Sequence, residues 1–318
     1  MVKMFSRNIH EDFTGPNTRI LEQTRGVTKI DRCVFFILKF VYLGLILLRI
    51  VLGKRRRDKL YIESGLSFKD FLWKSINFLC LENLILLEFS VPKYDYKFYY
   101  RVIGRDFSVM TCHEDQILDR FIPKQSDVVI NVGAHLGRHT IIASKRVGQT
   151  GKIVAIEAHL ENFKMLNRNI KLNKLTNVIP LNYAVYSNQT KLKLYMPDEE
   201  SSHHSTMLER VGETRKKFVE VNANTLDNLL QQNGVEEVNW VKIDVEGAEF
   251  EVLKGATKIL SKSNDIAILI EIHNSQNGTN LYRPIIEFLN NYNFKIEYEK
   301  IHDGGERHVM VRKQLKIS

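Results

Sequence analysis

Cysteine is scarce in this chain of 318 residues, which contains only Cys33, Cys80 and Cys112. Their number is odd, their spacing is wide and no two form a C-x-x-C pair, so the sequence predicts neither a disulfide framework nor a cysteine-based zinc site. The first 32 residues mix both charge signs and lack an apolar stretch of signal-peptide length. These absences predict a reducing, cytoplasmic location.

Most of the chain, residues 61–318, has a net charge close to zero. The formal net charge is +9, but residues 1–60 hold thirteen Lys and Arg against five Asp and Glu and so account for +8 of it. This basic arm predicts either attraction to an anionic lipid or polymer or a plain solvated segment, and it argues against a nucleic-acid groove across the remainder.

One long apolar run, CVFFILKFVYLGLILLRIVL at residues 33–52, is interrupted only by Lys39 and Arg49. As a helix it would span roughly 30 Å, about one hydrocarbon thickness, although Lys39 would cost about 2–3 kcal/mol at membrane depth. Three interpretations stay open: a transmembrane anchor, a helix in the membrane interface and a helix packed on the soluble domain. The basic cluster at residues 54–57 favours the cytoplasmic face for everything that follows, so membrane contact is predicted through residues 33–57.

The rest of the chain divides into a lead-in at residues 61–125 and an α/β domain at residues 126–318. In the lead-in, residues 71–87 have helical apolar spacing, and residues 97–111 alternate like a strand pair around Gly104.

The α/β domain alternates short apolar strands with helices, which predicts a mostly parallel, seven-stranded sheet covered by helices on both faces. The predicted strands are 127–133, 152–158, 178–185, 239–246, 266–273, 294–302 and 307–313, and the predicted helices are 137–147, 160–173, 225–233, 247–262 and 281–292. The tight connection at residues 303–305 predicts an antiparallel hairpin at the sheet edge.

Ligands of such sheets bind beyond the C-terminal ends of the strands. There the first strand continues into NVGAHLG at residues 131–137, whose small residues let the backbone approach a ligand at a helix N-terminus. The spacing is G-x-x-x-G and lacks the third glycine of a nicotinamide dinucleotide loop. Glu157 ends the second strand, twenty-four residues after Gly133, where a carboxylate can accept hydrogen bonds from ribose hydroxyls. Ala184, at the end of the third strand, would leave space for an adenine ring.

The segment VKIDVEGAE at residues 241–249 places Asp244, Glu246 and Glu249 at the end of a buried strand and the start of a helix. Carboxylates there are costly to desolvate unless a ligand or partner compensates them. Helix capping explains Glu246 or Glu249 alone, but it explains the whole group poorly.

These blocks resemble the FkbM family of methyltransferases over about residues 110–300. The resemblance is carried by NVGAHLGRHT, AIEAHLENFKMLNRNIKLN, LNYAV, NTLDNLL, VKIDVEGAEFEVLKGA and ILIEIH, in this order and spacing. It implies an α/β, Rossmann-like class I methyltransferase fold, S-adenosyl-L-methionine as methyl donor, and O-methylation of a sugar, glycolipid or polyketide-type hydroxyl.

The resemblance also implies roles for individual residues. It assigns the cofactor loop to Gly133, Ala134, His135 and Gly137, the ribose contact to Glu157, and the active site to Asp244 and Glu246. Asn131 stands where the family usually shows Asp, and His135 where it usually shows Asn. Asn131 can still hydrogen-bond the methionyl amino group, but it lacks the charge.

Methyl transfer to a hydroxyl requires alignment and the removal of one proton. The candidate bases are Asp244, Glu246 and His273, and the sequence does not choose among them. Metal dependence is possible but has no support in the sequence, because His203 and His204 lie in a polar insert without an i, i+4 partner or a nearby Cys. A loop that binds the acceptor is favoured there over a metal site.

The predicted partner is a small-molecule, glycan or glycolipid acceptor. None of the six prolines forms an Asn/Asp-Pro-Pro-aromatic motif, which disfavours methylation of nucleic-acid bases. Two alternatives stay open: a nucleotide-dependent oxidoreductase, and a membrane-tethered binding module of the same fold without turnover.

Overall fold

The computed structural model describes residues 86–91, 95–101, 115–195, 218–273, 280–302 and 305–314. The chain divides into two compact units, residues 1–111 and 112–318, and each is considered by itself. No helix within the described ranges is long and apolar enough to cross a membrane. The predicted apolar helix at residues 33–52 lies outside these ranges, as do His203 and His204.

In the first unit, β1 (Leu86–Val91) and β2 (Tyr96–Arg101) form an antiparallel hairpin. Asp95 lies just before β2 with φ +48°, a conformation that Asp tolerates better than most residues. The prediction of helix up to residue 87 is therefore wrong at its end. The strand predicted from residue 97 was expected to pair with the residues after Gly104. It pairs instead with β1, because the chain reverses between β1 and β2.

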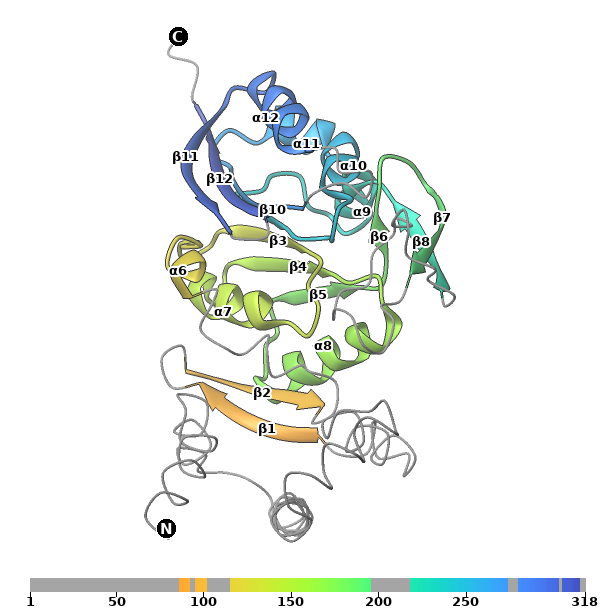
Figure 1. Ribbon diagram of the computed structural model, residues 1–318. Helices are drawn as coiled ribbons and strands as arrows, with labels where there is room; N and C mark the ends of the chain where they lie inside the picture. The colour runs from red at the N-terminus through yellow and green to blue at the C-terminus, as the bar shows by residue number, and fades with distance from the viewer. Residues whose placement is uncertain are drawn as a thin grey trace, which may run out of the picture. The chain divides into compact units, whose positions relative to one another are not determined.

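The second unit is built on a seven-stranded sheet (Figure 1). Its strands are β3 (Val128–Val132), β4 (Lys152–Ile156), β5 (Val178–Leu181), β9 (Trp240–Ile243), β10 (Ala267–Ile272), β11 (Phe294–Ile301) and β12 (Arg307–Lys313). The spatial order is β11-β12-β10-β9-β3-β4-β5, and β12 alone runs antiparallel to both of its neighbours. This confirms the predicted class I methyltransferase fold and its terminal antiparallel hairpin.

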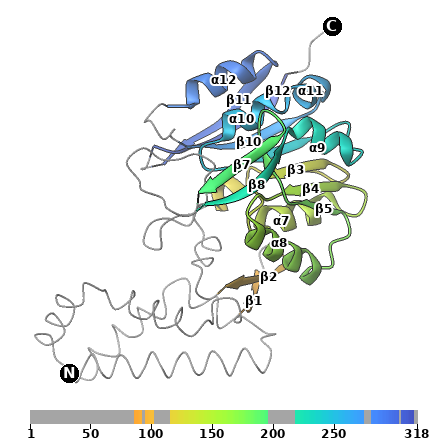
Figure 2. The same cartoon turned by 90° about the vertical axis from the view of Figure 1, so that its right-hand side faces the viewer.

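Helices cover both faces of the sheet, as Figures 1 and 2 show. One face carries α6 (Asp115–Leu118), α7 (Arg138–Val147) and α8 (Leu160–Leu172); the other carries α9 (Leu226–Gln232), α10 (Glu249–Lys254), α11 (Thr257–Lys262) and α12 (Tyr282–Asn290). Successive residues of a strand point to opposite faces of the sheet. Val129 packs against α7 on one face, and Ile130 packs in the core under α9, α10, α11 and α12 on the other. The strands are thus apolar on both sides, as parallel strands between two helical layers must be.

The helix predicted at residues 247–262 is two helices, α10 and α11. They separate at Gly255, where a Cβ atom would lie 2.3 Å from the carbonyl oxygen of Tyr186. The carboxylate of Asp227 then accepts hydrogen bonds from the backbone N–H groups of Lys258 (2.8 Å) and Ile259 (3.0 Å), which satisfies donors at the new helix start.

The third strand is shorter than predicted. β5 ends at Leu181, and the side chain of Asn182 donates to the carbonyl oxygens of Glu157 (2.8 Å) and Ala158 (3.1 Å), which fixes the turn away from the sheet. Ala184 instead starts β6 (Ala184–Val185), which joins β8 (Phe218–Asn224) and β7 (Thr190–Tyr195) in a separate three-stranded sheet. The placement of Ala184 at the end of a main-sheet strand is therefore wrong.

Candidate active site

The loop after β3 is shaped by close backbone contacts. Gly133 has φ +77°, and a Cβ atom there would lie 1.8 Å from the carbonyl oxygen of Asp244, after β9. The N–H groups of Gly133 and Ala134 both donate to the carbonyl oxygen of Ile156, at the end of β4. The loop therefore joins the ends of three adjacent strands, and position 133 must be glycine.

The second half of this loop rests on α8. His135 has φ +51°, a conformation in which histidine is enriched, and Gly137 has φ +99° directly before α7. A Cβ atom at Gly137 would lie 2.7 Å from Cδ1 of Leu166, and the buried Asn169 side chain donates to the carbonyl oxygen of Leu136 at 2.8 Å. These contacts hold the loop in one conformation.

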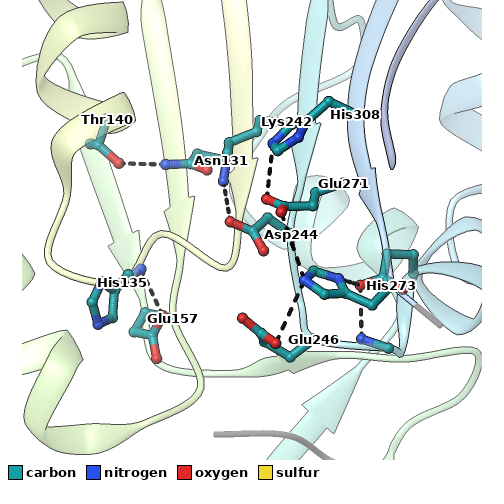
Figure 3. A network of polar contacts seen from close by, with 12 residues as sticks. Asn131, His135, Thr140, Glu157, Lys242, Asp244, Glu246, Glu271, His273 and His308 are labelled. Atoms are coloured by element: carbon teal, nitrogen blue, oxygen red, sulfur yellow. Dashed lines mark hydrogen bonds and ion pairs between the residues drawn. The ribbon is translucent and has the colours of Figure 1, made fainter. Parts of the chain in front are cut away.

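Glu157 lies directly beside this loop (Figure 3). Its carboxylate accepts hydrogen bonds from the backbone N–H groups of His135 (2.7 Å) and His159 (2.9 Å). Burial raises the pKa of the Glu157 carboxyl from its ordinary value of 4.5 to about 7, although these two bonds and one from the Asn162 side chain oppose the shift. The predicted ribose-binding carboxylate is thus oriented from one side and buried.

Asn131, on β3, is almost fully buried next to the same loop. Its side-chain nitrogen donates to the hydroxyl of Thr140 at 2.9 Å, which fixes the orientation of the amide. Its side-chain oxygen is buried and has no hydrogen-bond partner among the described residues. A buried acceptor of this kind is costly unless a ligand supplies a donor.

A second group of side chains follows β9 and β10. Asp244 accepts a 2.7 Å ion-pair hydrogen bond from Lys242, and Glu246 adopts φ +56°. His273, just after β10, hydrogen-bonds through Nδ1 to Glu249 at 2.9 Å, and its Nε2 lies 3.6 Å from Glu246. One oxygen on each of Asp244 and Glu246 and one ring nitrogen of His273 all lie within 4.8 Å of one another. The three predicted catalytic residues therefore meet.

Two members of this network were not anticipated from the sequence. Glu271 lies 3.0 Å from His308 and 3.9 Å from Nε2 of His273, and His308 also hydrogen-bonds His302 at 2.8 Å. The sequence could have indicated Glu271, since Glu271 and His273 are two positions apart along a predicted strand and hence point to the same face of the sheet. Only the pairing of β10 with β12, however, places His308 opposite Glu271.

The charge of His273 differs from expectation. Burial alone would lower its pKa, but the hydrogen bond and charge of Glu249, with the charges of Glu246 and Asp244, outweigh it and raise the pKa to about 10. The surrounding carboxylates therefore favour positive charge on the ring, whereas the sequence suggested an ordinary, near-neutral pKa for it.

Comparisons with known proteins identify the family of the α/β domain. The family model described as the methyltransferase FkbM domain matches residues 131–296, more than half of the chain. The chain belongs to the FkbM methyltransferase family. S-Adenosylmethionine is accordingly the cofactor of the domain, as the resemblance implied.

Two methyltransferases are similar in sequence to part of this chain. The chain is 30% identical to the hexuronic acid methyltransferase AglP of Haloferax volcanii, over 47% of this chain and 57% of that protein. It is 26% identical to the methyltransferase sdnD of Sordaria araneosa, over 52% of this chain and 71% of that protein. The chain thus matches little more than half the length of the first.

A solved structure, the methyltransferase FkbM from Methylobacillus flagellatus, is 14% identical with a TM-score of 0.41, covering 59% of this chain and 43% of that one. This similarity is too low to support an inference about the site. The strand order, the antiparallel terminal hairpin and the helices on both faces define the fold.

The contact between Gly133 and Asp244 leads to a test of stability. Gly133→Ala is expected to lower the free energy of unfolding by about 1–3 kcal/mol more than Gly234→Ala, because its methyl group meets a carbonyl oxygen. Gly234 is a matched control, since it also has a positive φ (+64°) but open space around it. Urea unfolding followed by circular dichroism measures both, and equal losses would contradict the packing described.

The buried Glu157 carboxyl leads to a test of pH dependence. Because the folded protein holds the proton more tightly than the unfolded chain, the stabilisation is complete below pH 4.5 and is lost as the pH rises through about 7. Glu157→Gln removes this titration. Between about pH 5 and pH 8, wild type should lose roughly 2–3 kcal/mol of unfolding free energy relative to the variant. A difference that stays constant with pH would argue against the buried, proton-retaining carboxyl.

Proposed function

We propose that the protein is an S-adenosylmethionine-dependent O-methyltransferase acting on a hydroxyl of a sugar, glycolipid or related metabolite. The observation that carries this proposal is the convergence of two groups at one sheet edge. The loop after β3 with Glu157 forms one group, and Asp244, Glu246 and His273 form the other. Gly133 touches the backbone of Asp244 and so links the two.

The first group fits the cofactor chemically. Glu157 keeps acceptor capacity for a ribose hydroxyl beyond its two backbone bonds and the one from the Asn162 side chain, since a carboxylate has about four acceptor sites. The unpartnered oxygen of Asn131 suits the methionyl amino group, a donor. The loop from Gly133 to Gly137 offers small residues against which the ligand can lie. Ala184, which follows the end of β5 as the first residue of β6, remains a predicted neighbour of the adenine ring.

The second group would handle the proton. Bound S-adenosylmethionine supplies a methyl carbon already activated by a sulfonium. Asp244 and Glu246 orient the acceptor hydroxyl and take its proton as the new C–O bond forms and the C–S bond breaks, its electron pair passing to sulfur. His273 lies 3.6 Å from Glu246 and would help to hold it in place.

A sugar acceptor is favoured by one relative. The printed name of AglP specifies a hexuronic acid, a sugar that carries several hydroxyls beside a carboxylate. We expect the acceptor side to be formed by the three-stranded sheet and by the insert between β7 and β8. Contact with the cytoplasmic face of a membrane through residues 33–57, and the boundaries at residues 60 and 125, remain predictions.

The proposal predicts a separation of binding from turnover in Asp244→Asn. The variant should bind S-adenosylhomocysteine within a few-fold of wild type by calorimetry, because it keeps the shape of the residue. Its rate of methyl transfer should fall about a hundredfold or more, since a positioned proton acceptor contributes that much. The assay follows labelled methyl from the cofactor into a panel of hexuronic acids, their glycosides, and lipid and glycan extracts.

Glu236→Gln is the matched control, because Glu236 is an exposed carboxylate at the surface that pairs only with Lys262 in the contacts described. It should turn over like wild type. Wild-type turnover in Asp244→Asn would remove Asp244 from the mechanism. Tight binding of S-adenosylhomocysteine without methyl transfer to any acceptor would instead support the inactive binding module, and preferential binding of NADH would support the oxidoreductase.

A further inference from the structure

The cluster of Asp244, Glu246 and His273 has a second chemical property. We propose that these three residues bind one divalent metal ion, of the Mn²⁺ or Mg²⁺ kind, which also contacts the oxygen of the methyl acceptor. This inference rests on the proposed function for the role of the metal, whereas the metal site itself depends only on the geometry of the side chains.

The spacing of the ligand atoms supports a common ion. Two carboxylate oxygens and one imidazole nitrogen lie within 4.8 Å of one another, and the Glu246 and His273 atoms are 3.6 Å apart. Ligands about 2.0–2.2 Å from one ion lie up to about 4.4 Å apart, so a small rotation of the side chains brings all three into range. None of the three is fully exposed, which distinguishes the cluster from acidic groups on a solvated surface.

The surroundings of His273 resemble those of a metal-ligating histidine. Such a histidine usually donates its other ring N–H to a carboxylate, which fixes the tautomer and the ring orientation. Here Nδ1 lies 2.9 Å from Glu249, whose oxygen also accepts a hydrogen bond from the N–H of Gly247 at 2.8 Å. This leaves Nε2 on the side of Glu246 and Glu271. A bound cation would replace the proton on Nε2, because the same carboxylates attract both.

An independent observation is a buried carboxylate oxygen beside the cluster. Glu249 is completely buried, and its second oxygen has no hydrogen-bond partner among the described residues. Its first oxygen bonds Nδ1 of His273, and carboxylate oxygens of Glu246 and Glu271 lie 3.6 Å and 3.9 Å from Nε2 of the same ring. Negative charge gathered in this way around one histidine is stabilised by a cation.

The ligand set also suggests what the ion does. Mg²⁺ and Mn²⁺ take about six ligands, so two carboxylates and one imidazole leave positions for oxygens of the acceptor and for water. A metal lowers the pKa of a hydroxyl bound to it, which makes proton removal by a nearby carboxylate easier. An acceptor with two neighbouring oxygens, a vicinal diol or a hydroxy acid, would occupy two open positions and gain a fixed orientation.

Titration of the purified full-length chain with Mn²⁺, following free Mn²⁺ by electron paramagnetic resonance, tests the site directly. Wild type and the exposed-carboxylate control Glu236→Gln should bind one ion per chain with equal affinity. Glu246→Gln and His273→Gln should weaken binding at least about tenfold. Glu249→Gln, which touches the metal only through His273, should weaken it about tenfold to a hundredfold.

Circular dichroism of each variant shows whether the variant is folded. If a ligand variant does not fold, the near-isosteric Asp244→Asn takes its place in the titration. Absence of a Mn²⁺ site in wild type, or affinity unchanged in all ligand variants, overturns the inference. Calorimetry with S-adenosylhomocysteine separates the two proposals. Cofactor binding and methyl transfer that survive dialysis against EDTA would leave the proposed function standing and remove the metal. Mn²⁺ binding without cofactor binding or methyl transfer would leave the metal site standing and remove the proposed function.

Discussion

The close approach of Gly133 to the carbonyl oxygen of Asp244 is the constraint on which the rest of the site depends. Only a residue without a side chain lets the loop after β3 pass over the end of β9. The same residue bonds through its N–H to the end of β4. The loop after β3, the Glu157 carboxylate beside it and the cluster of Asp244, Glu246 and His273 lie at the same edge of the sheet, and this main-chain contact sets the loop against Asp244.

Much of this arrangement could be predicted from sequence because two signals are local. Apolar runs such as VVIN and AILIEI identify strands, and a parallel sheet brings all their C-terminal ends to one edge. Residues that directly follow a strand, such as Glu157, Asp244 and His273, are then expected along that same edge. The order of motifs was specific enough to indicate the family, which the match over residues 131–296 confirms.

The remainder could not be predicted because it depends on contacts between distant segments. Gly255 ends a helix only because the backbone of Tyr186 lies against it, and Asn182 ends β5 through carbonyl groups of another loop. The charge of His273 is a similar case. Nothing in ILIEIH shows that Glu249 will reach its ring from the next helix, so its pKa could not be anticipated from the sequence.

The pairing of β7 with β8 has a consequence for how this protein can change. Tyr195 and Phe218 are partners in that ladder, with ring centroids 6.0 Å apart, so the two residues that flank residues 196–217 lie side by side. Lengthening, shortening or exchanging that segment costs little loop-closure entropy and leaves the seven-stranded sheet intact. The length of residues 196–217 can therefore change without any change in the order or register of the seven strands.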